Sequence, residues 1–113
     1  MVDDDRTTVK LLQTLLELDG FEIQVATRGA DVMPLVEQTM PDLVFMDYHL
    51  SDMDGVAVLR SLRETPKYAA LPIVMTSGLD VEDEARAAGA TTFILKPFEP
   101  DDLPKLFNSL LQG

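Results

Sequence analysis

The sequence predicts an α/β fold, in which a doubly wound parallel sheet is covered by helices on both faces. Five short strand-like segments alternate with four or five helical patterns, which is typical of strands joined by crossover helices. Three segments, over residues 43–46, 73–76 and 92–95, are nearly continuous apolar runs, as expected for strands buried on both faces. Residues 21–25 alternate apolar and polar side chains, so we expect an edge strand there. A chain of 113 residues should form one domain over residues 1–113.

The first strand is expected to be short, because only Met1 and Val2 precede an acidic run. In this topology the strand would be central, and a short one leaves its neighbours without ladder partners. Either further strand residues lie upstream of the given sequence, or the middle strand is short. We expect four or five added apolar residues to raise stability by several kcal/mol, at roughly 1.5–3 kcal/mol for each buried aliphatic side chain less the ordering cost. A partner chain that fills the gap, giving a homodimer, is the alternative.

The helices are predicted from the spacing of their apolar residues and from the capping residues at their ends. The first is expected from Arg6 to Asp19, closed by Gly20. Its expected buried stripe consists of four leucines: Leu11, Leu12, Leu15 and Leu16.

Proline, glycine and aspartate residues indicate where the remaining helices begin, bend or end. The second should span residues 30–39 with a kink at Pro34. The third should begin after an Asp54 cap and Gly55 and bury apolar residues at 56, 59 and 62. The fourth should be short, over residues 81–88 and closed by a glycine, and the last should have its N-cap at Asp102 because Pro104 suits a first turn.

Composition excludes several classes of function. The formal net charge of −11 argues against binding of nucleic acid through phosphate neutralisation. The absence of cysteine excludes disulfides and thiolate metal sites. No apolar run approaches the ~20 residues that span a bilayer, and residues 1–10 are polar and acidic, so we expect no membrane or signal segment and a cytoplasmic location.

Reactive side chains stand where four of the predicted strands end. They are the acidic run Asp3, Asp4 and Asp5, then Asp47, Ser77 and Lys96. Because the carboxyl ends of parallel strands meet at one edge of a sheet, these groups should lie together. Carboxylates suit a hard cation such as Mg²⁺, and a carboxylate can also attack phosphorus. An ammonium and a hydroxyl can then neutralise the oxygens of a transferred phosphoryl group.

Seven stretches resemble one family in their order and spacing. They are residues 2–5, 11–12, 41–47, 53–55, 71–78, 88–90 and 96–98. Over nearly its whole length the chain is similar to the receiver domain of response regulators in two-component signal transduction. That resemblance implies a flavodoxin-like (βα)5 fold with strand order 2-1-3-4-5. It also implies a phosphorylation-controlled switch that works in a phosphorelay.

The resemblance assigns a role to each candidate residue. Asp47 would accept a phosphoryl group from the phosphohistidine of a histidine kinase or phosphotransfer protein. The implied Mg²⁺ ligands are Asp4, Asp47 and the backbone carbonyl of His49, with Asp3 acting through water. The implied switch and phosphoryl-binding residues are Ser77, Phe93 and Lys96, with a cis Lys96–Pro97 bond. Asp5 falls outside the family's acidic pair and is expected to be solvated.

Two departures from the family pattern concern the surroundings of the site. Ser51 replaces the usual proline in the loop after Asp47, so we expect a more mobile loop. The stretch from Ser77 to Gly89 is about three residues shorter than in typical members, which shortens the fourth helix. The expected output face is formed by that helix, the fifth strand and the last helix, and its partner is unknown.

The same residues are compatible with other interpretations. Phe93 could be an ordinary core residue, and His49 is expected at the mouth of the pocket without a catalytic role. A phosphorylation-independent interaction module of the same fold is the alternative function. An aspartyl phosphohydrolase would usually need an aspartate at position 49, where this chain has histidine. We therefore expect no enzyme beyond phosphorylation and dephosphorylation of the chain itself.

Overall fold

The computed structural model describes residues 1–3 and 5–112. Its regular elements, in chain order, are α1 (Arg6–Leu18), η1 (Gly29–Asp31), α2 (Val32–Thr39), β1 (Val44–Asp47), α3 (Gly55–Glu64), η2 (Pro66–Tyr68), β2 (Ile73–Ser77), α4 (Glu82–Ala87), β3 (Thr92–Leu95) and α5 (Asp102–Gln112). Asp4, a predicted metal ligand, lies outside the described residues. Among those described, no helix is both long and apolar enough to cross a bilayer.

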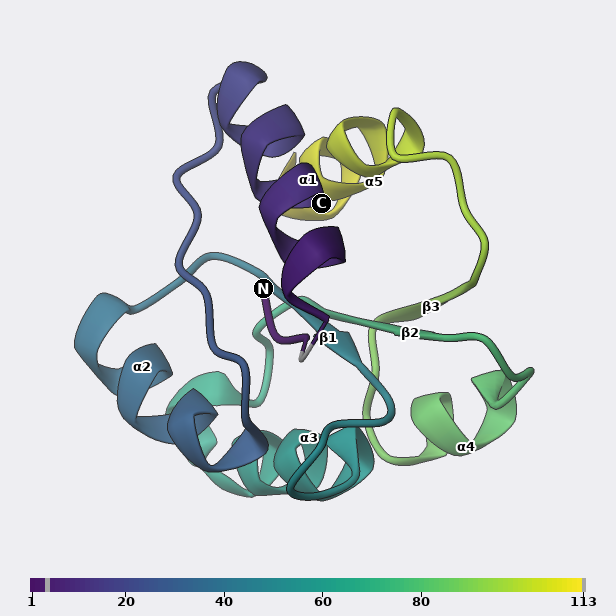
Figure 1. The fold of residues 1–113 in the computed structure, drawn as a ribbon. Coiled ribbons are helices and arrows are strands. Elements are labelled where there is room, and N and C mark those ends of the chain that lie inside the picture. The colour runs from purple at the N-terminus through teal and green to yellow at the C-terminus, as the bar shows by residue number, and fades with distance from the viewer. Residues whose placement is uncertain (4, 113) are drawn as a thin grey trace.

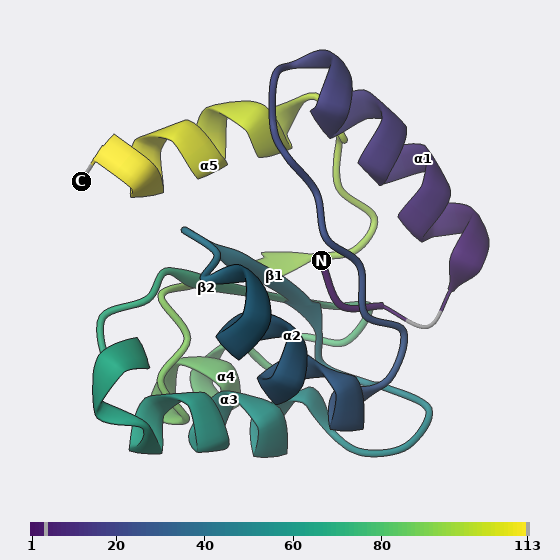
Figure 2. The same cartoon turned by 90° about the vertical axis from the view of Figure 1, so that its left-hand side faces the viewer.

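The sheet lies between two layers of helices, as the sequence predicts. Helices α1 and α5 cover one face, and α2, α3 and α4 cover the other (Figures 1 and 2). The three strands are parallel in the order β1-β2-β3. Asp47 pairs with Thr76, and Ser77 pairs with Leu95, so the carboxyl ends of all three strands meet at one edge.

The N-terminal segment lies between residue 26 and β1. Val2 forms parallel bridges to Ala26 on one side and to Met46 on the other. At these paired residues, the N-terminal segment lies between the segment of Ala26 and β1, which agrees with the predicted strand order 2-1-3. The predicted edge strand over residues 21–25 is wrong, since no strand forms there and only Ala26 pairs. A strand at that place needs a neighbour of its own length, and the first segment supplies a single bridging residue.

The core consists of two clusters on opposite faces of the sheet. Phe45 and Met46 are adjacent on β1, and they belong to different clusters because successive strand residues point to opposite faces. The cluster that contains Met46 also contains Leu59 of α3, and the cluster that contains Phe45 also contains Phe107 of α5. The prediction that residues 92–95 are fully buried is wrong: β3 is half-buried to exposed, because it is the last strand of the sheet.

The buried stripe of α1 differs from the predicted one by a rotation of the helix. Val9, Leu12 and Leu16 are buried, at spacings of three and four residues. Leu11 is 54% exposed, so its place in the predicted stripe is wrong. Gly20 adopts a positive φ of 90° after the helix, as expected for a glycine in a C-terminal cap.

Two prolines stand in first turns, where a missing N–H costs no helical hydrogen bond. The α-helix α2 begins at Val32 after the short helix η1, so Pro34 lies in its first turn and not inside a helix that starts at residue 30; the kink itself stays a prediction. Pro104 lies in the first turn of α5, as predicted. The helix begins one residue earlier than expected, since Asp102 is its first helical residue rather than its cap.

Candidate functional site

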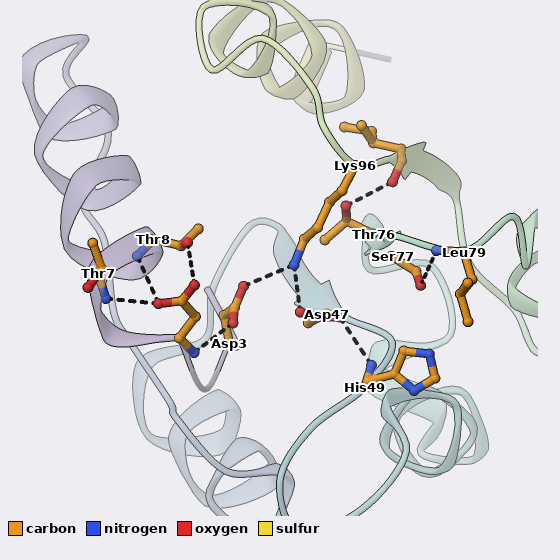
Figure 3. Close-up of polar contacts among 11 residues, drawn as sticks. Asp3, Thr7, Thr8, Asp47, His49, Thr76, Ser77, Leu79 and Lys96 are labelled. Carbon is orange, nitrogen blue, oxygen red and sulfur yellow. Dashed lines mark hydrogen bonds and ion pairs between the residues drawn. The ribbon is translucent and has the colours of Figure 1, made fainter.

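Asp47 is the last residue of β1, and its carboxylate is held in place from two sides. The residue is 8% exposed. One oxygen, Oδ2, accepts a hydrogen bond from Lys96 Nζ at 2.7 Å, and the other, Oδ1, accepts one from the backbone N–H of His49 at 3.1 Å. Figure 3 shows both contacts at the carboxyl edge of the sheet. A buried carboxylate beside a single ammonium is therefore positioned at the strand end.

Lys96 also faces the second buried carboxylate of the site. Its Nζ lies 3.6 Å from Oδ2 of Asp3, which is 5% exposed. Burial lowers the pKa of Lys96, but the hydrogen bond and charge of Asp47 and the charge of Asp3 outweigh it and hold the pKa above its usual value. The ammonium therefore stays charged between two carboxylates.

Asp5 has a structural role that the sequence prediction missed. It is the N-cap of α1, and its carboxylate accepts hydrogen bonds from the backbone N–H groups of Thr7 and Thr8 and from the Thr8 hydroxyl, at 3.1, 3.3 and 2.8 Å. The hydrogen bonds from Thr8 lower the pKa of this exposed carboxyl. Asp5 thus fixes the start of α1 next to the site, although it is solvent-exposed as expected.

Ser77 and Thr76 end β2 with their hydroxyls in different directions. The buried Ser77 Oγ accepts a hydrogen bond from the backbone N–H of Leu79 at 3.1 Å (Figure 3). Thr76 Oγ1 donates to the carbonyl of Ile94 on β3 at 2.8 Å. Because a hydroxyl can accept and donate at once, Ser77 keeps its proton for a further acceptor.

The remaining predicted residues lie around the Asp47 carboxylate and the Lys96 ammonium. Phe93 is half-buried on β3 and packs against the core cluster beneath α2 and α3, which fits either a switch or a core side chain. The His49 side chain is exposed, and its ring meets that of Tyr48 in an edge-to-face arrangement at 4.8 Å between centroids. The Lys96–Pro97 bond is cis, as predicted.

The loop after Asp47 is anchored by the carboxylate of Asp52, a residue outside the motifs that predict the site. Asp52 accepts hydrogen bonds from the backbone N–H groups of Gly29 at 2.8 Å and Ala30 at 3.0 Å, where η1 begins. A side chain at Gly55 would collide with the carbonyl of Asp47, so only glycine lets α3 start this close to the site. The expected mobility from Ser51 stays a prediction, and these anchors oppose it.

A second unexpected contact joins the loop to α4. The Tyr48 hydroxyl donates to Glu84 Oε2 at 2.9 Å, and this bond raises the pKa of the tyrosine. The two residues are 36 positions apart in the chain. Neither residue belongs to a motif, so the sequence carried no signal for this pair.

The donor atoms of the site suit a hard cation. Asp3 and Asp47 contribute two buried carboxylates to one sheet edge, and carboxylate oxygen is the donor that Mg²⁺ prefers. Within residues 1–3 and 5–112, no three acidic, histidine or cysteine side chains gather closely enough to form a metal site by themselves. The set of two carboxylates fits an ion that keeps several water ligands.

Known proteins of one family resemble the chain in sequence and in structure. The family model for the response regulator receiver domain matches residues 1–108. Protein PilH of Pseudomonas aeruginosa is 29% identical over 116 residues, which cover 100% of this chain and 96% of that protein. A putative response regulator from Chloroflexus aurantiacus superposes with a TM-score of 0.92 at 30% identity, covering 99% of this chain and 94% of that one.

Some relatives are considerably longer than this chain. The phosphate regulon transcriptional regulatory protein PhoB of Rhizobium meliloti is 30% identical over 115 residues, which cover 99% of this chain and 51% of that protein. The regulatory protein AtoC of Escherichia coli is 33% identical, and the match covers 24% of it. The chain thus spans about half of the length of the first of these curated relatives and about a quarter of the second.

Proposed function

Because the chain belongs to the response-regulator receiver domain family of two-component systems, we propose that it is a signalling switch controlled by phosphorylation of Asp47. The observation that carries this proposal is the buried Asp47 carboxylate, held 2.7 Å from Lys96 Nζ at the end of β1. A carboxylate is a weak nucleophile that becomes effective when it is positioned and when charge on the phosphoryl oxygens is neutralised.

The donor is a phosphohistidine on a histidine kinase or a phosphotransfer protein. An Asp47 oxygen forms a bond to phosphorus while the bond from phosphorus to the imidazole nitrogen breaks. The electron pair of that bond stays with the imidazole, which takes up a proton, and the product is an acyl phosphate on Asp47. Lys96 turns from the carboxylate to the phosphoryl oxygens, and the Ser77 hydroxyl donates to another of them. Hydrolysis of the acyl phosphate resets the switch, so the chain acts only on itself.

Mg²⁺ is the cofactor that the carboxylates suit. Asp47 and the backbone carbonyl of His49 would hold it with Asp4, and Asp3 would act through a water ligand. When bound, the ion supplies positive charge next to the transferred phosphoryl group. A receiver domain of the sensor histidine kinase PA1611 from Pseudomonas aeruginosa, 21% identical, is described with a magnesium ion in its active site cleft. That likeness concerns the fold, and the ion is proposed here from the carboxylates of this chain.

The signal leaves the site through Ser77 and Phe93. In the unphosphorylated state the Ser77 hydroxyl is engaged by the Leu79 N–H. Movement of Ser77 toward the phosphoryl group gives up that contact and opens space for the half-buried Phe93, which shifts a pre-existing equilibrium between two conformers. The face formed by α4, β3 and α5 then changes. Leu79 and Leu95, 62% and 49% exposed, are large apolar side chains on this side that an output partner can cover.

The direct test is the intact mass of the protein after treatment with acetyl phosphate and Mg²⁺. We expect the addition of one phosphoryl group, absent in Asp47→Asn and retained in the matched variant Asp101→Asn, whose aspartate is exposed and lies just before α5. A shift that survives in Asp47→Asn would reject Asp47 as the acceptor. A folded wild-type protein that never gains the phosphoryl group would instead favour the phosphorylation-independent interaction module.

A further inference from the structure

The loop over residues 48–54 joins the end of β1 to the start of α3, and main-chain contacts close it on itself. The Gly55 N–H donates to the Tyr48 carbonyl at 2.6 Å, and His49 forms an isolated antiparallel bridge to Asp54. The two ends of the loop are thus paired with each other beside the last residue of β1. We therefore expect the loop to change position as one unit.

This loop carries two contacts of the proposed phosphorylation site. The His49 N–H donates to Asp47 Oδ1 at 3.1 Å (Figure 3), and the His49 carbonyl is the main-chain ligand proposed for Mg²⁺. An ion that binds the Asp47 carboxylate and this carbonyl needs both groups in place at the same time. The position of the loop therefore affects how tightly the ion can be held.

A side chain of the loop ties it to a segment far away in the sequence. The Asp52 carboxylate accepts hydrogen bonds from the N–H groups of Gly29 and Ala30 at 2.8 and 3.0 Å, across 23 and 22 positions of the chain. The neighbouring Met53 lies so close to Gly29 that a Cβ there would collide with it. Two adjacent residues of the loop therefore contact the start of η1.

The same contact supplies a cap that η1 lacks locally. The first N–H groups of a helix have no partner within it and are usually bonded by the side chain of the N-cap residue. The N-cap residue of η1 is Arg28, which makes no capping bond, and its guanidinium donates to Asp31 instead. Asp52 fills this role from another part of the chain, so the loop and η1 stabilise each other.

We propose that Asp52 is a positioning residue for Mg²⁺, because its contact with η1 keeps the loop where the His49 carbonyl can bind the ion. The inference rests on the proposed function and adds a residue that acts on that site through the loop. A loop that is already held loses less conformational entropy when the ion binds, which raises the affinity. Because such coupling is reciprocal, bound Mg²⁺ must in turn stabilise the contact between Asp52 and η1.

The first test compares Kd values for Mg²⁺, measured by calorimetric titration at constant ionic strength. Asp52→Ala removes both hydrogen bonds, and we expect binding to weaken by about tenfold, as for other residues that orient metal ligands. Asp52→Asn keeps an oxygen acceptor, which caps a helix start about as well as aspartate does, and it should recover most of the affinity.

Asp54→Ala is the matched control for charge. Asp54 carries an exposed carboxylate in the same loop, and its side chain makes no capping bond to α3. The variant should bind Mg²⁺ like the wild type. Equal weakening in Asp52→Ala and Asp54→Ala, or an Asp52→Asn variant as weak as Asp52→Ala, would assign the effect to the charge of the loop and overturn the positioning role.

Hydrogen exchange of the wild type gives a second test that needs no variant. Saturating Mg²⁺ should slow exchange at the amides of Gly29 and Ala30, while the amide of Ala69 at the end of η2 should change less. Equal slowing at all three amides would reflect global stabilisation and contradict the coupling. If the wild type binds Mg²⁺ and Asp52→Ala binds it equally well, only this inference fails. If the wild type binds no Mg²⁺, both this inference and the proposed metal site fail.

Discussion

The two edges of the sheet satisfy their polar groups in different ways. At the carboxyl edge the buried polar groups are side chains, and Lys96 lies between the carboxylates of Asp47 and Asp3. At the amino edge they belong to the main chain. There Arg63 donates hydrogen bonds to main-chain carbonyls just before β2 and β3. We infer from this difference that the carboxyl edge is suited to gain or lose charge on its side chains, whereas the hydrogen bonds at the amino edge contribute mainly to the stability of the fold.

The largest effect expected at the amino edge comes from Arg63→Met. The guanidinium donates to the carbonyls of Leu71, Gly89 and Tyr68 at 2.7, 2.8 and 2.9 Å, and these carbonyls lose a charged donor in the variant. Since one hydrogen bond to a charged group contributes about 1.5–3 kcal/mol, we expect a loss of roughly 3 kcal/mol in the free energy of unfolding by urea. Arg60→Met, an exposed neighbour on α3, is the matched control and should change it little. Equal losses of stability in both variants would contradict the idea that the hydrogen bonds from Arg63 to these carbonyls stabilise the fold.

The carboxyl edge should respond to a cation instead. Mg²⁺ that binds only the folded state at a hundredfold excess over its Kd adds about 2.7 kcal/mol. We expect thermal unfolding to shift upward with millimolar MgCl₂ in the wild type and much less in Asp47→Asn. In the absence of metal, Asp47→Asn should melt higher than the wild type, because it removes one of the like charges that gather there. The Asp101→Asn control should follow the wild type, and a wild-type curve that ignores Mg²⁺ would remove the basis for the site.

Sequence reasoning predicted the carboxyl edge better than the amino edge, for a physical reason. The ends of β1 and β2 lie within one residue of the expected positions, and the apolar runs before Asp47 and Ser77 made them visible. The contacts of Asp52 with Gly29 and of Tyr48 with Glu84 join residues 23 and 36 positions apart. No local pattern encodes such pairs.

The errors at the amino edge come from one missing neighbour. Residues 21–25 have the alternation of a strand, but a strand also requires a partner, and in the described structure the N-terminal segment pairs with this stretch only through the bridge from Val2 to Ala26. Local propensity was therefore overridden by the lack of pairing. The exposed Leu11 shows a similar limit, because four leucines in one helix fit more than one stripe and packing selects among them.

The amino edge should also show a pH dependence of its own. Burial lowers the pKa of the Met1 amino group from 8.0 to about 6. The unfolded chain therefore binds this proton more tightly than the folded one, and stability rises as the pH increases from about 6 to 8. At about 1.4 kcal/mol for each pKa unit, the change is on the order of 2 kcal/mol. Urea unfolding at both pH values measures it, with Met1 verified by intact mass. N-terminal acetylation should remove the difference, and an acetylated protein with the same pH profile would assign it to another group.

The smallest effect expected is that of Tyr48→Phe, which separates coupling from stability at the carboxyl edge. The variant removes only the hydroxyl that donates to Glu84, a contact at the protein surface, so the free energy of unfolding should fall by less than about 1 kcal/mol. The hydrogen bond nevertheless ties the residue after Asp47 to α4, a helix of only six residues. We therefore expect faster amide hydrogen exchange in α4 with little change in α5, and Glu84→Gln, which keeps an acceptor, should preserve most of the protection. Uniform acceleration across both helices would mean that Tyr48 contributes to global stability and does not specifically hold α4 to the site.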